Sequence, residues 1–333
     1  MNRLFSSGYG LVIFSALGFS FKSIFAKLAF SYGTDAMTLM LMRIYVSLPF
    51  FLVVLWYLEG REGFRLNMKE VLYFAILGIA GLGCAMLFSL YSLESIAASL
   101  STILVFTYPA MTVILGLFIS GQQVTAGRWV SLLITFAGLV LVVNPDKAMM
   151  SSVESQGLYL ALASALCYAF YNLYSEKALQ RVSPAKLTTY SMVFFVAFFG
   201  VLFGNRAYPG PGPVWTIAMF MGVVSGFLPF LCYMYGVKKI GAAKAVIISS
   251  MGPLFTVVWA GFFLGERLSF IQLAGMVFII AGVMSIKIRS PFRFVKGTAG
   301  EIGSRLESLS REGRKRGGTF AFVYVTKGEE EQN

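Results

Sequence analysis

The sequence predicts an all-α integral membrane protein with ten transmembrane helices, arranged as two inverted five-helix repeats. Three observations predict this fold class: ten apolar runs of membrane-spanning length, basic residues that gather on alternate linkers, and an internal repeat that divides the chain near its middle. A helix of about 20 apolar residues crosses the hydrocarbon core of a bilayer, which is about 30 Å thick.

The composition excludes several functional classes. Hydrophobic residues make up 57% of the 333 residues and charged residues 13%, which is typical of membrane proteins. The chain has no histidine, the commonest metal ligand and general base, and its three cysteines are isolated in apolar runs. We therefore expect no cofactor and no enzymatic activity. Cytoplasmic loops and a basic tail explain the formal charge of +12, so nucleic acid is not an expected partner.

Short polar linkers separate the ten apolar runs. The first run lacks a convincing cleavage site, so we expect a membrane helix there rather than a signal peptide. The predicted helices cover residues 9–31, 36–58, 70–92, 96–120, 125–144, 157–178, 185–204, 214–236, 242–264 and 268–288.

Basic residues test this helix count. With the N-terminus inside the cell, the outer loops carry only Lys147, Arg206 and Arg267, whereas the inner segments before the tail carry eleven lysines and arginines. Cytoplasmic loops are enriched in these residues, and a miscount by one helix would scramble the alternation. The pattern predicts a multi-pass protein of the bacterial inner membrane with both termini cytoplasmic. The eleven inner residues are Arg3, Arg61, Arg65, Lys69, Arg128, Lys177, Arg181, Lys186, Lys238, Lys239 and Lys244.

The two halves of the chain resemble each other. A shift of 144 residues aligns 91–121 with 235–265 without a gap and pairs Pro109 with Pro253. Earlier in each half, a shift of 149 residues aligns the two sequences. Because each half holds an odd number of spans, the second half enters the membrane from the opposite side, and such inverted repeats suit alternating access.

The repeat divides the chain into three parts. We expect a first five-helix repeat over 1–146, a second over 147–290 and a basic cytoplasmic tail over 291–333. The tail is polar and is predicted to be disordered, although its basic residues could also rest on anionic lipid headgroups.

One motif in the second half carries a family resemblance. The stretch "GPLFTVVWAGFFLGERLSFIQLAGMVFIIAGV", 252–283, contains a proline, an apolar run, a Gly-Glu pair with Glu266 and a glycine-rich helix. Together with Lys27 in "AKLAF" and Arg43 in "MLMRIYV", it makes residues 9–288 resemble the EamA-type family of the drug/metabolite transporter superfamily.

This resemblance implies a ten-helix transporter with a central cavity and with the fifth and tenth helices at the periphery. It does not imply a substrate. The first-half copy of the motif departs from the family pattern, because "SGQQVTAGR" has Gln122 where the family usually has glutamate.

Pro109 and Pro253 fall near the middle of the fourth and ninth predicted helices. A proline removes a backbone hydrogen bond and kinks its helix. The freed carbonyls can line a polar cavity or serve as a hinge, and a purely structural kink is the alternative.

The sixth predicted helix carries a polar stripe whose members lie within about 100° of one another. Polar side chains in a membrane helix turn toward protein or water, so the stripe is expected to line a cavity; hydrogen bonding between helices is the alternative. Shifted back by 149 residues, the stripe reaches Ser15 and Lys22 in the first helix. The stripe comprises Ser164, Tyr168, Tyr171, Asn172 and Ser175.

The first predicted helix carries two lysines with different expected roles. Lys22 lies near the bilayer midplane, where an unpaired charge is costly, so it is expected to face the cavity or to have a structural partner. Lys27 lies about 140° further around the helix, near its outer end, where it can reach the interface. The predicted substrate-binding residues are Lys22, Ser15, Tyr168, Tyr171, Asn172 and Ser175.

A second group of residues is predicted to act as gate or hinge. Glu94, at the outer end of the third helix, is the nearest carboxylate expected for Lys27 and Arg43. The full group is Pro109, Pro253, Lys27, Arg43, Glu94, Tyr91 and Tyr235.

These observations predict a secondary transporter of small organic metabolites that works by alternating access, with export favoured. Three cations within the spans and no carboxylate near mid-membrane favour anionic or zwitterionic solutes, such as amino acids. Lys22 could itself exchange a proton, so proton coupling is possible. An importer or facilitator of the same fold, a channel and a non-transporting membrane protein remain alternatives, and the oligomeric state stays open. An intramembrane enzyme is disfavoured, because the spans lack a nucleophile with its base or a cluster of carboxylates.

Overall fold

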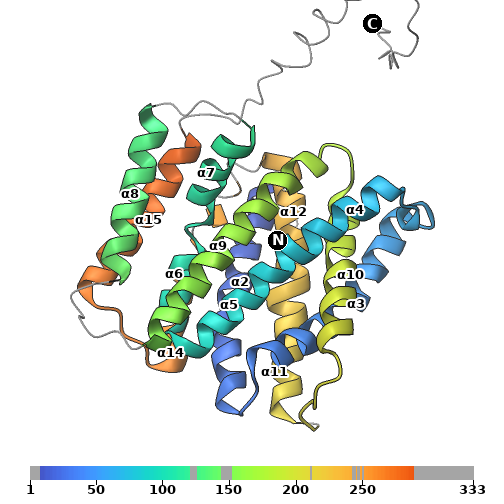
Figure 1. Ribbon diagram of the computed structural model, residues 1–333, viewed down its shortest axis with the longest axis horizontal. Helices are drawn as coiled ribbons and strands as arrows, with labels where there is room; N and C mark the ends of the chain where they lie inside the picture. Colours follow the sequence, from blue (N-terminus) through green and yellow to red (C-terminus); the bar gives the residue numbers. More distant parts are fainter. Residues whose placement is uncertain are drawn as a thin grey trace, which may run out of the picture. The chain divides into compact units, whose positions relative to one another are not determined.

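The computed structural model describes residues 8–120, 126–143, 152–210, 212–241, 245, 248–249 and 251–288, and every regular element in these ranges is helical (Figure 1). The all-α prediction is therefore confirmed for this part of the chain. The basic tail predicted over 291–333 lies outside the described residues.

Among the residues that the structure describes, seven helical segments are long and apolar enough to cross a membrane. Two of them are continuous helices built from three pieces: α4 (Met68–Ile76), η2 (Leu77–Gly83) and α5 (Cys84–Ser95), then α11 (Pro213–Gly222), η3 (Val223–Phe227) and α12 (Leu228–Ile240). A third, Ala98–Gly116, comprises α6 (Ala98–Val105) and most of α7 (Tyr108–Ser120). The other four are α2 (Gly8–Ser31), α3 (Ala36–Glu59), α9 (Ser152–Ala178) and α10 (Pro184–Phe203).

Three shorter apolar helices complete the described part: α8 (Ala126–Val143), α14 (Gly252–Leu264) and α15 (Phe270–Ile288). Each of the ten predicted ranges thus contains a helix. That all ten helices cross the membrane stays a prediction. Large apolar side chains such as Trp56, Phe262 and Phe270 are exposed on the outside of the bundle. Exposed apolar surface of this kind is expected where lipid replaces water.

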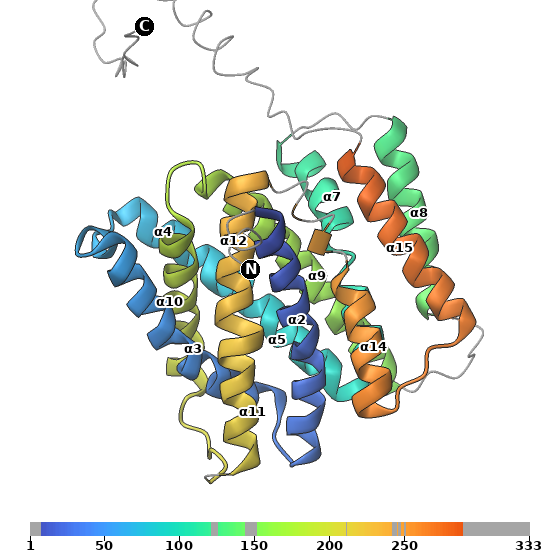
Figure 2. The same ribbon diagram turned by 180° about the vertical axis from the view of Figure 1, so that it is seen from behind.

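The helices pack as a central group with one peripheral pair. Centrally, α2 packs along α12 and α14, α5 along α9, and α3 along α10 and α11. Figures 1 and 2 both show α8 and α15 side by side at one edge of the bundle. The family resemblance implies that the fifth and tenth helices lie at the periphery. The helices α8 and α15 occupy that position.

Glycines set the close contact between α8 and α15. A Cβ atom on Gly138 would lie 2.7 Å from the carbonyl oxygen of Gly275, and a Cβ on Gly275 would lie 2.7 Å from the carbonyl oxygen of Gly138. Small residues at a crossing let membrane helices approach closely. The two backbones therefore touch at Gly138 and Gly275.

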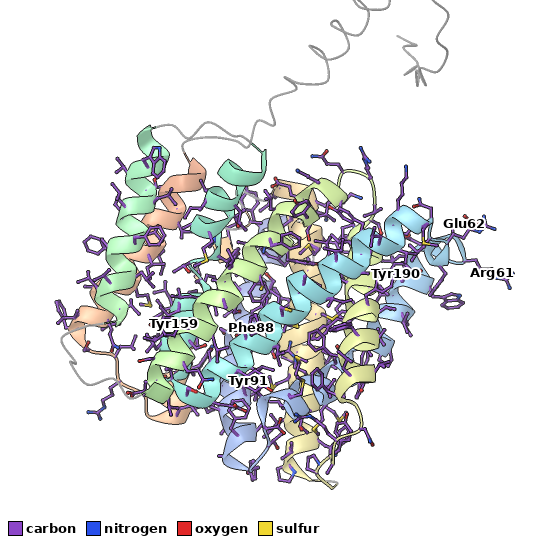
Figure 3. All side chains as sticks on the ribbon, viewed as in Figure 1. Arg61, Glu62, Phe88, Tyr91, Tyr159 and Tyr190 are labelled. Atoms are coloured by element: carbon purple, nitrogen blue, oxygen red, sulfur yellow. The ribbon has the colours of Figure 1, made fainter. Side chains whose placement is uncertain are left out.

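The loops gather at two opposite ends of the bundle. We name the Asp35 end by residues 32–35, 205–210 and 212, and the Glu62 end by residues 60–67 and 179–183. In Figure 3 Arg61 and Glu62 mark the Glu62 end, and Tyr91 lies toward the other.

Polar contacts join α3 to α10 at both ends. Asp35 caps α3 by accepting from the backbone N–H groups of Met37 (3.1 Å) and Thr38 (3.2 Å), and Arg206 Nη1 lies 2.8 Å from its Oδ2. Partial burial raises the pKa of Asp35, but the Thr38 hydrogen bonds and the Arg206 charge outweigh it and leave that pKa below its usual value. At the Glu62 end Ser183 caps α10 and donates to Glu59.

Two short π-helical segments interrupt the long helices at matching places. The segment η2 lies inside α4–η2–α5, and η3 lies inside α11–η3–α12, which are the third spans of the two halves. Single π turns occur frequently at functional sites. In η2, a Cβ on Gly81 would meet Tyr171 of α9 at 3.1 Å, so glycine allows a tight approach here.

The two repeat-related prolines begin helices rather than bend them. Pro109 is the second residue of α7, which follows a break after α6, and Pro253 is the second residue of α14. The missing N–H of proline is tolerated at a helix start, where it has no partner within the helix. The predicted kinks are thus helix breaks in the described residues.

The glycine crossing gives a first prediction. Replacing Gly138 with leucine forces α8 and α15 apart, and overpacking of this kind costs about 1–3 kcal/mol. Thermal unfolding of the purified protein in detergent should show a lower Tm. Gly210 is the matched control because a Cβ there meets nothing within 4 Å, so Gly210→Leu should leave the Tm unchanged. Equal Tm values for both variants would contradict this role of the crossing.

Candidate functional site

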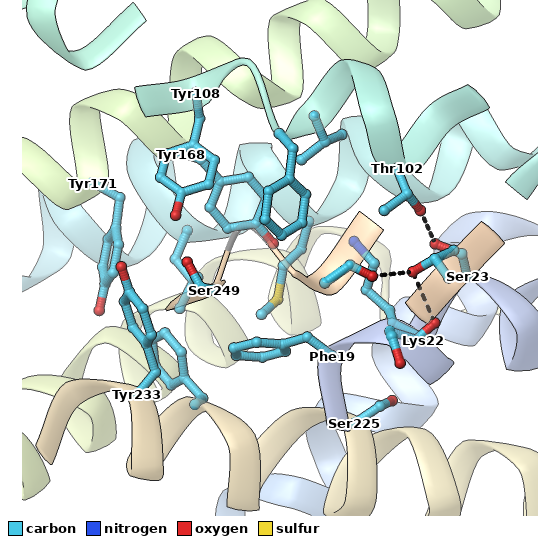
Figure 4. Close-up of a pocket in the computed structure, with 18 of the residues that line it drawn as sticks. Phe19, Lys22, Ser23, Thr102, Tyr108, Tyr168, Tyr171, Ser225, Tyr233 and Ser249 are labelled. Carbon is cyan, nitrogen blue, oxygen red and sulfur yellow. Dashed lines mark hydrogen bonds between the residues drawn. The ribbon is translucent and has the colours of Figure 1, made fainter. Parts of the chain in front are cut away.

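A cavity of about 120 Å³ lies at mid-depth between the central helices (Figure 4). One water needs roughly 10–15 Å³ of such space, so the cavity can hold a small organic molecule. Tyrosines gather on one side of it, while Lys22, Ser23 and Thr102 lie on the other. The π segments contribute Leu82 and Ser225 to its wall.

The cavity wall carries two cationic side chains. Lys22, on α2, donates a hydrogen bond from Nζ to Ser89 Oγ on α5 at 2.8 Å. Arg43, on α3, is near enough to repel the charge of Lys22. The described residues that line the cavity include no aspartate or glutamate. The electrostatic potential of the cavity-lining side chains is therefore positive.

Arg43 is deeply buried. Its side chain is 3% exposed, and its Nε and Nη1 atoms have no hydrogen-bond partner among the described residues. The glycines of α11 and η3 make room for it: a Cβ on Gly222 would lie 2.7 Å from the Arg43 carbonyl oxygen, and a Cβ on Gly226 would lie 3.7 Å from Nη2. Buried charges normally have a partner, so this one is unusual.

Aromatic side chains form the opposite wall. The ring of Tyr108 lies 6.3 Å from that of Tyr168, and the ring of Tyr171 lies 6.0 Å from that of Phe230. Ring pairs at such distances pack favourably and keep the wall apolar.

A smaller pocket of about 20 Å³ continues toward the Glu62 end and shares Tyr108, Asn172 and Tyr233 with the cavity. Glu176 borders it, a carboxylate that the sequence analysis did not assign to the site.

The structure brings together most of the predicted substrate-binding residues. Lys22, Tyr168, Tyr171 and Asn172 line the cavity, and Ser175 lines the smaller pocket. Ser15 does not reach either: it is fully buried and donates to the carbonyl oxygen of Val12 at 2.8 Å. Helical periodicity placed it on the right face, but its short side chain bonds to its own helix.

The predicted gate residues separate into several environments. Arg43 lines the cavity itself, and Pro109 borders the smaller pocket. Pro253 lies between Gly252 and the cavity residue Thr256 on α14. Tyr91 lies near the charges of the Asp35 end, whereas Tyr235 is near Glu59 at the Glu62 end.

Glu94 contacts the start of α3 rather than Lys27 or Arg43. Its Oε1 accepts from the backbone N–H of Ala36 at 2.5 Å and so caps α3 from the end of α5. The carboxylate whose charge acts on the half-buried Lys27 is Glu266. Neither Lys27 nor Arg43 forms a salt bridge with Glu94 within the described ranges.

Glu266 caps the start of α6. Its carboxylate accepts from the backbone N–H groups of Ala98 (2.7 Å) and Ser99 (3.0 Å) and from Ser99 Oγ (2.7 Å). Gly265 directs it there, because its φ of +67° is a left-handed conformation that glycine adopts without strain. The Gly-Glu motif thus joins the end of α14 to the start of α6, across the two halves.

Comparison with known proteins identifies the family. The model of the EamA-like transporter family matches residues 6–144 and 155–288, one match in each half. The chain belongs to this family of membrane transporters, as the resemblance predicted.

Several relatives are named as transporters. An uncharacterized transporter, YcbK of Bacillus subtilis, is 26% identical over 86% of this chain and 95% of its own. The uncharacterized transporter sll1319 of Synechocystis is 23% identical over 82% and 90%, and the uncharacterized inner membrane transporter YicL of Salmonella typhimurium is 24% identical over 72% and 81%. One solved crystal structure shares the fold, with a TM-score of 0.62 at 16% identity over 85% of this chain and 97% of that one.

The site has the chemistry of a binding cavity. It offers cationic donors, hydroxyl groups and an aromatic wall, as ligand sites commonly do. Within the described residues, no group of three or more histidine, cysteine, aspartate or glutamate side chains lies together in a way that could hold a metal ion.

The Glu266 cap gives a second prediction. Glu266→Ala removes three hydrogen bonds at the start of α6, and losing a helix cap costs about 0.5–2 kcal/mol. Glu266→Gln keeps an acceptor oxygen and should cost less. Thermal unfolding in detergent should therefore rank the Tm as wild type, then Gln, then Ala. The exposed neighbour Arg267→Ala is the control, and a Glu266→Ala Tm equal to the control would refute the cap.

Proposed function

We propose that this protein is a secondary transporter of small anionic or zwitterionic organic solutes, such as amino acids, and that it works by alternating access between two inverted repeats of five membrane helices. The main support for this proposal is the mid-depth cavity. Lys22 and Arg43 both line it, and the described residues of its wall include no carboxylate. A positive potential in a low-dielectric cavity favours negatively charged groups.

The arrangement of the helices supports an inverted repeat. The π segments interrupt the third span of each half, and the paired prolines begin α7 and α14. Tyr91 and Tyr235, paired by the sequence repeat, lie near opposite ends of the bundle, as an inversion requires. In alternating access each half adopts the other's conformation in turn, so the Glu266 contacts with α6 would open and close with access from the Asp35 end.

The topology completes the proposal. All ten helices cross the bacterial inner membrane, with both termini in the cytoplasm and the Asp35 end outside. Export is favoured. An importer or facilitator of the same fold would use the same cavity, whereas a channel or a non-transporting protein would not exchange solute across it.

The two lysines of α2 give a third prediction. Lys22 lines the cavity and Lys27 does not, so Lys22→Gln should lower transport at least about tenfold, the effect of losing one charge-assisted hydrogen bond. Lys27→Gln should stay within about threefold of wild type. The measurement is counterflow in proteoliposomes with a panel of radiolabelled carboxylates and zwitterions.

Counterflow also separates the alternatives. Accelerated exchange is expected of a carrier, and its absence with every solute would contradict transport. Equal losses in both lysine variants would contradict the assignment of Lys22 to the site.

Proton coupling through Lys22 gives a fourth prediction. If this lysine exchanges the coupled proton, the wild-type rate depends on pH and on an imposed proton gradient, and Lys22→Gln loses both dependences. The same proteoliposomes, assayed between pH 5.5 and 8.5, provide the test. A variant with an unchanged pH profile would rule out Lys22 as the coupling group.

A further inference from the structure

We propose that the cavity takes a small monocarboxylate. Its carboxylate group bridges Arg43 and Lys22, and its apolar body, no larger than about one six-membered ring, lies against the aromatic wall. This inference rests on the proposed function and names the substrate class of that same site.

The unpaired guanidinium of Arg43 is the first indication of a bound anion. Two of its nitrogens are buried without an acceptor in the described part of the chain, and nothing in the cavity wall neutralises its charge. Unsatisfied buried polar groups are rare in native proteins, and a buried charge without a partner is strongly destabilising. A bound anion supplies both the acceptor and the opposite charge. The guanidinium is planar and matches a carboxylate in shape.

The remaining donors on this side of the cavity limit the head group. Ser23 and Thr102 hydroxyls bond to each other at 2.8 Å, Ser20 donates to Leu17, Ser225 donates to Met221, and Thr256 donates to carbonyl oxygens of Ser20 and Gly252. Apart from one hydroxyl hydrogen of the Ser23–Thr102 pair, these donors are already committed to protein partners.

On this side of the cavity, Arg43 and Lys22 provide the cationic donors for a ligand. The ammonium group of Lys22 has three N–H donors, and Ser89 accepts from it at 2.8 Å. Two cationic donors match the two oxygens of one carboxylate. Inorganic phosphate matches the cationic donors but has no apolar body to contact the aromatic wall.

Size and wall composition limit the rest of the ligand. The cavity measures about 120 Å³. A dry engineered cavity of about 150 Å³ binds benzene in another protein, so one ring or a short branched chain is the upper limit here. Phe19, Tyr168 and Phe230 provide the apolar contact surface. In Figure 4 Phe19 and the tyrosines lie apart from the polar corner at Lys22, which matches an amphipathic molecule.

The test uses purified full-length protein in detergent and two probes of equal shape, benzoate and its neutral analogue benzamide. Ligand binding to the folded state raises the Tm, and a saturating probe should raise it by about 2 °C or more. Benzoate should stabilise the protein, and benzamide should not. Succinate and inorganic phosphate test the dicarboxylate and phosphate alternatives and should be weaker than benzoate.

Variants locate the effect. Arg43→Gln and Lys22→Gln should each raise the Kd for benzoate about tenfold or more, the usual effect of losing a hydrogen bond to a charged group. Arg206→Gln removes a cation at the Asp35 end, away from the cavity, and should leave the Kd unchanged. If Arg43→Gln does not fold, Lys22→Gln and the two wild-type probes decide the question.

Three results would overturn the inference: equal stabilisation by benzamide, stabilisation by succinate or phosphate but not by benzoate, or an unchanged Kd in Lys22→Gln. Counterflow then separates this inference from the proposed function. Benzoate binding without counterflow of any carboxylate would leave the binding site in place and contradict transport. Counterflow of neutral solutes, unaffected by Lys22→Gln, would leave transport in place and contradict the monocarboxylate.

Discussion

A bilayer offers no water to the polar groups of the backbone, and this constraint explains most polar contacts inside the bundle. Helix starts are capped by carboxylates distant in sequence: Glu94 of α5 caps α3, and Glu266, in the loop after α14, caps α6. Buried hydroxyl groups, such as those of Ser15 and Ser225, bond to carbonyl oxygens one turn earlier. Most polar side chains therefore complete the helices, and the few that do not are informative about function.

The same constraint decides where irregular backbone can lie. Non-helical backbone at membrane depth is tolerated where protein or a cavity surrounds it. The breaks before Pro109 and Pro253 and the two π segments are all next to the cavity, to which they contribute Tyr108, Gly252, Leu82 and Ser225. The interruptions thus create the space between the helices, and glycines allow the neighbouring backbones to close around it.

Helical periodicity and the repeat were sufficient to predict the all-α fold and four cavity residues, Lys22, Tyr168, Tyr171 and Asn172. The family followed from its resemblance to the motif at 252–283. They could not predict which residue caps a distant helix, because Glu266 and Ala98 meet only in the folded bundle. The sequences of the two π segments show no pattern, apart from their glycines, that would predict a π-helix. Arg43 was assigned to a gate because the sequence gives its depth in α3 but not the direction of its side chain.

The repeat also pairs positions whose side chains differ in charge between the two halves. Lys22 corresponds to Tyr171, and both line the cavity, one cationic and one aromatic. Lys27 corresponds to Glu176, so the same register carries a cation near Glu266 in the first half and a carboxylate beside the smaller pocket in the second. The two halves thus share one helical register but carry different side chains at equivalent positions.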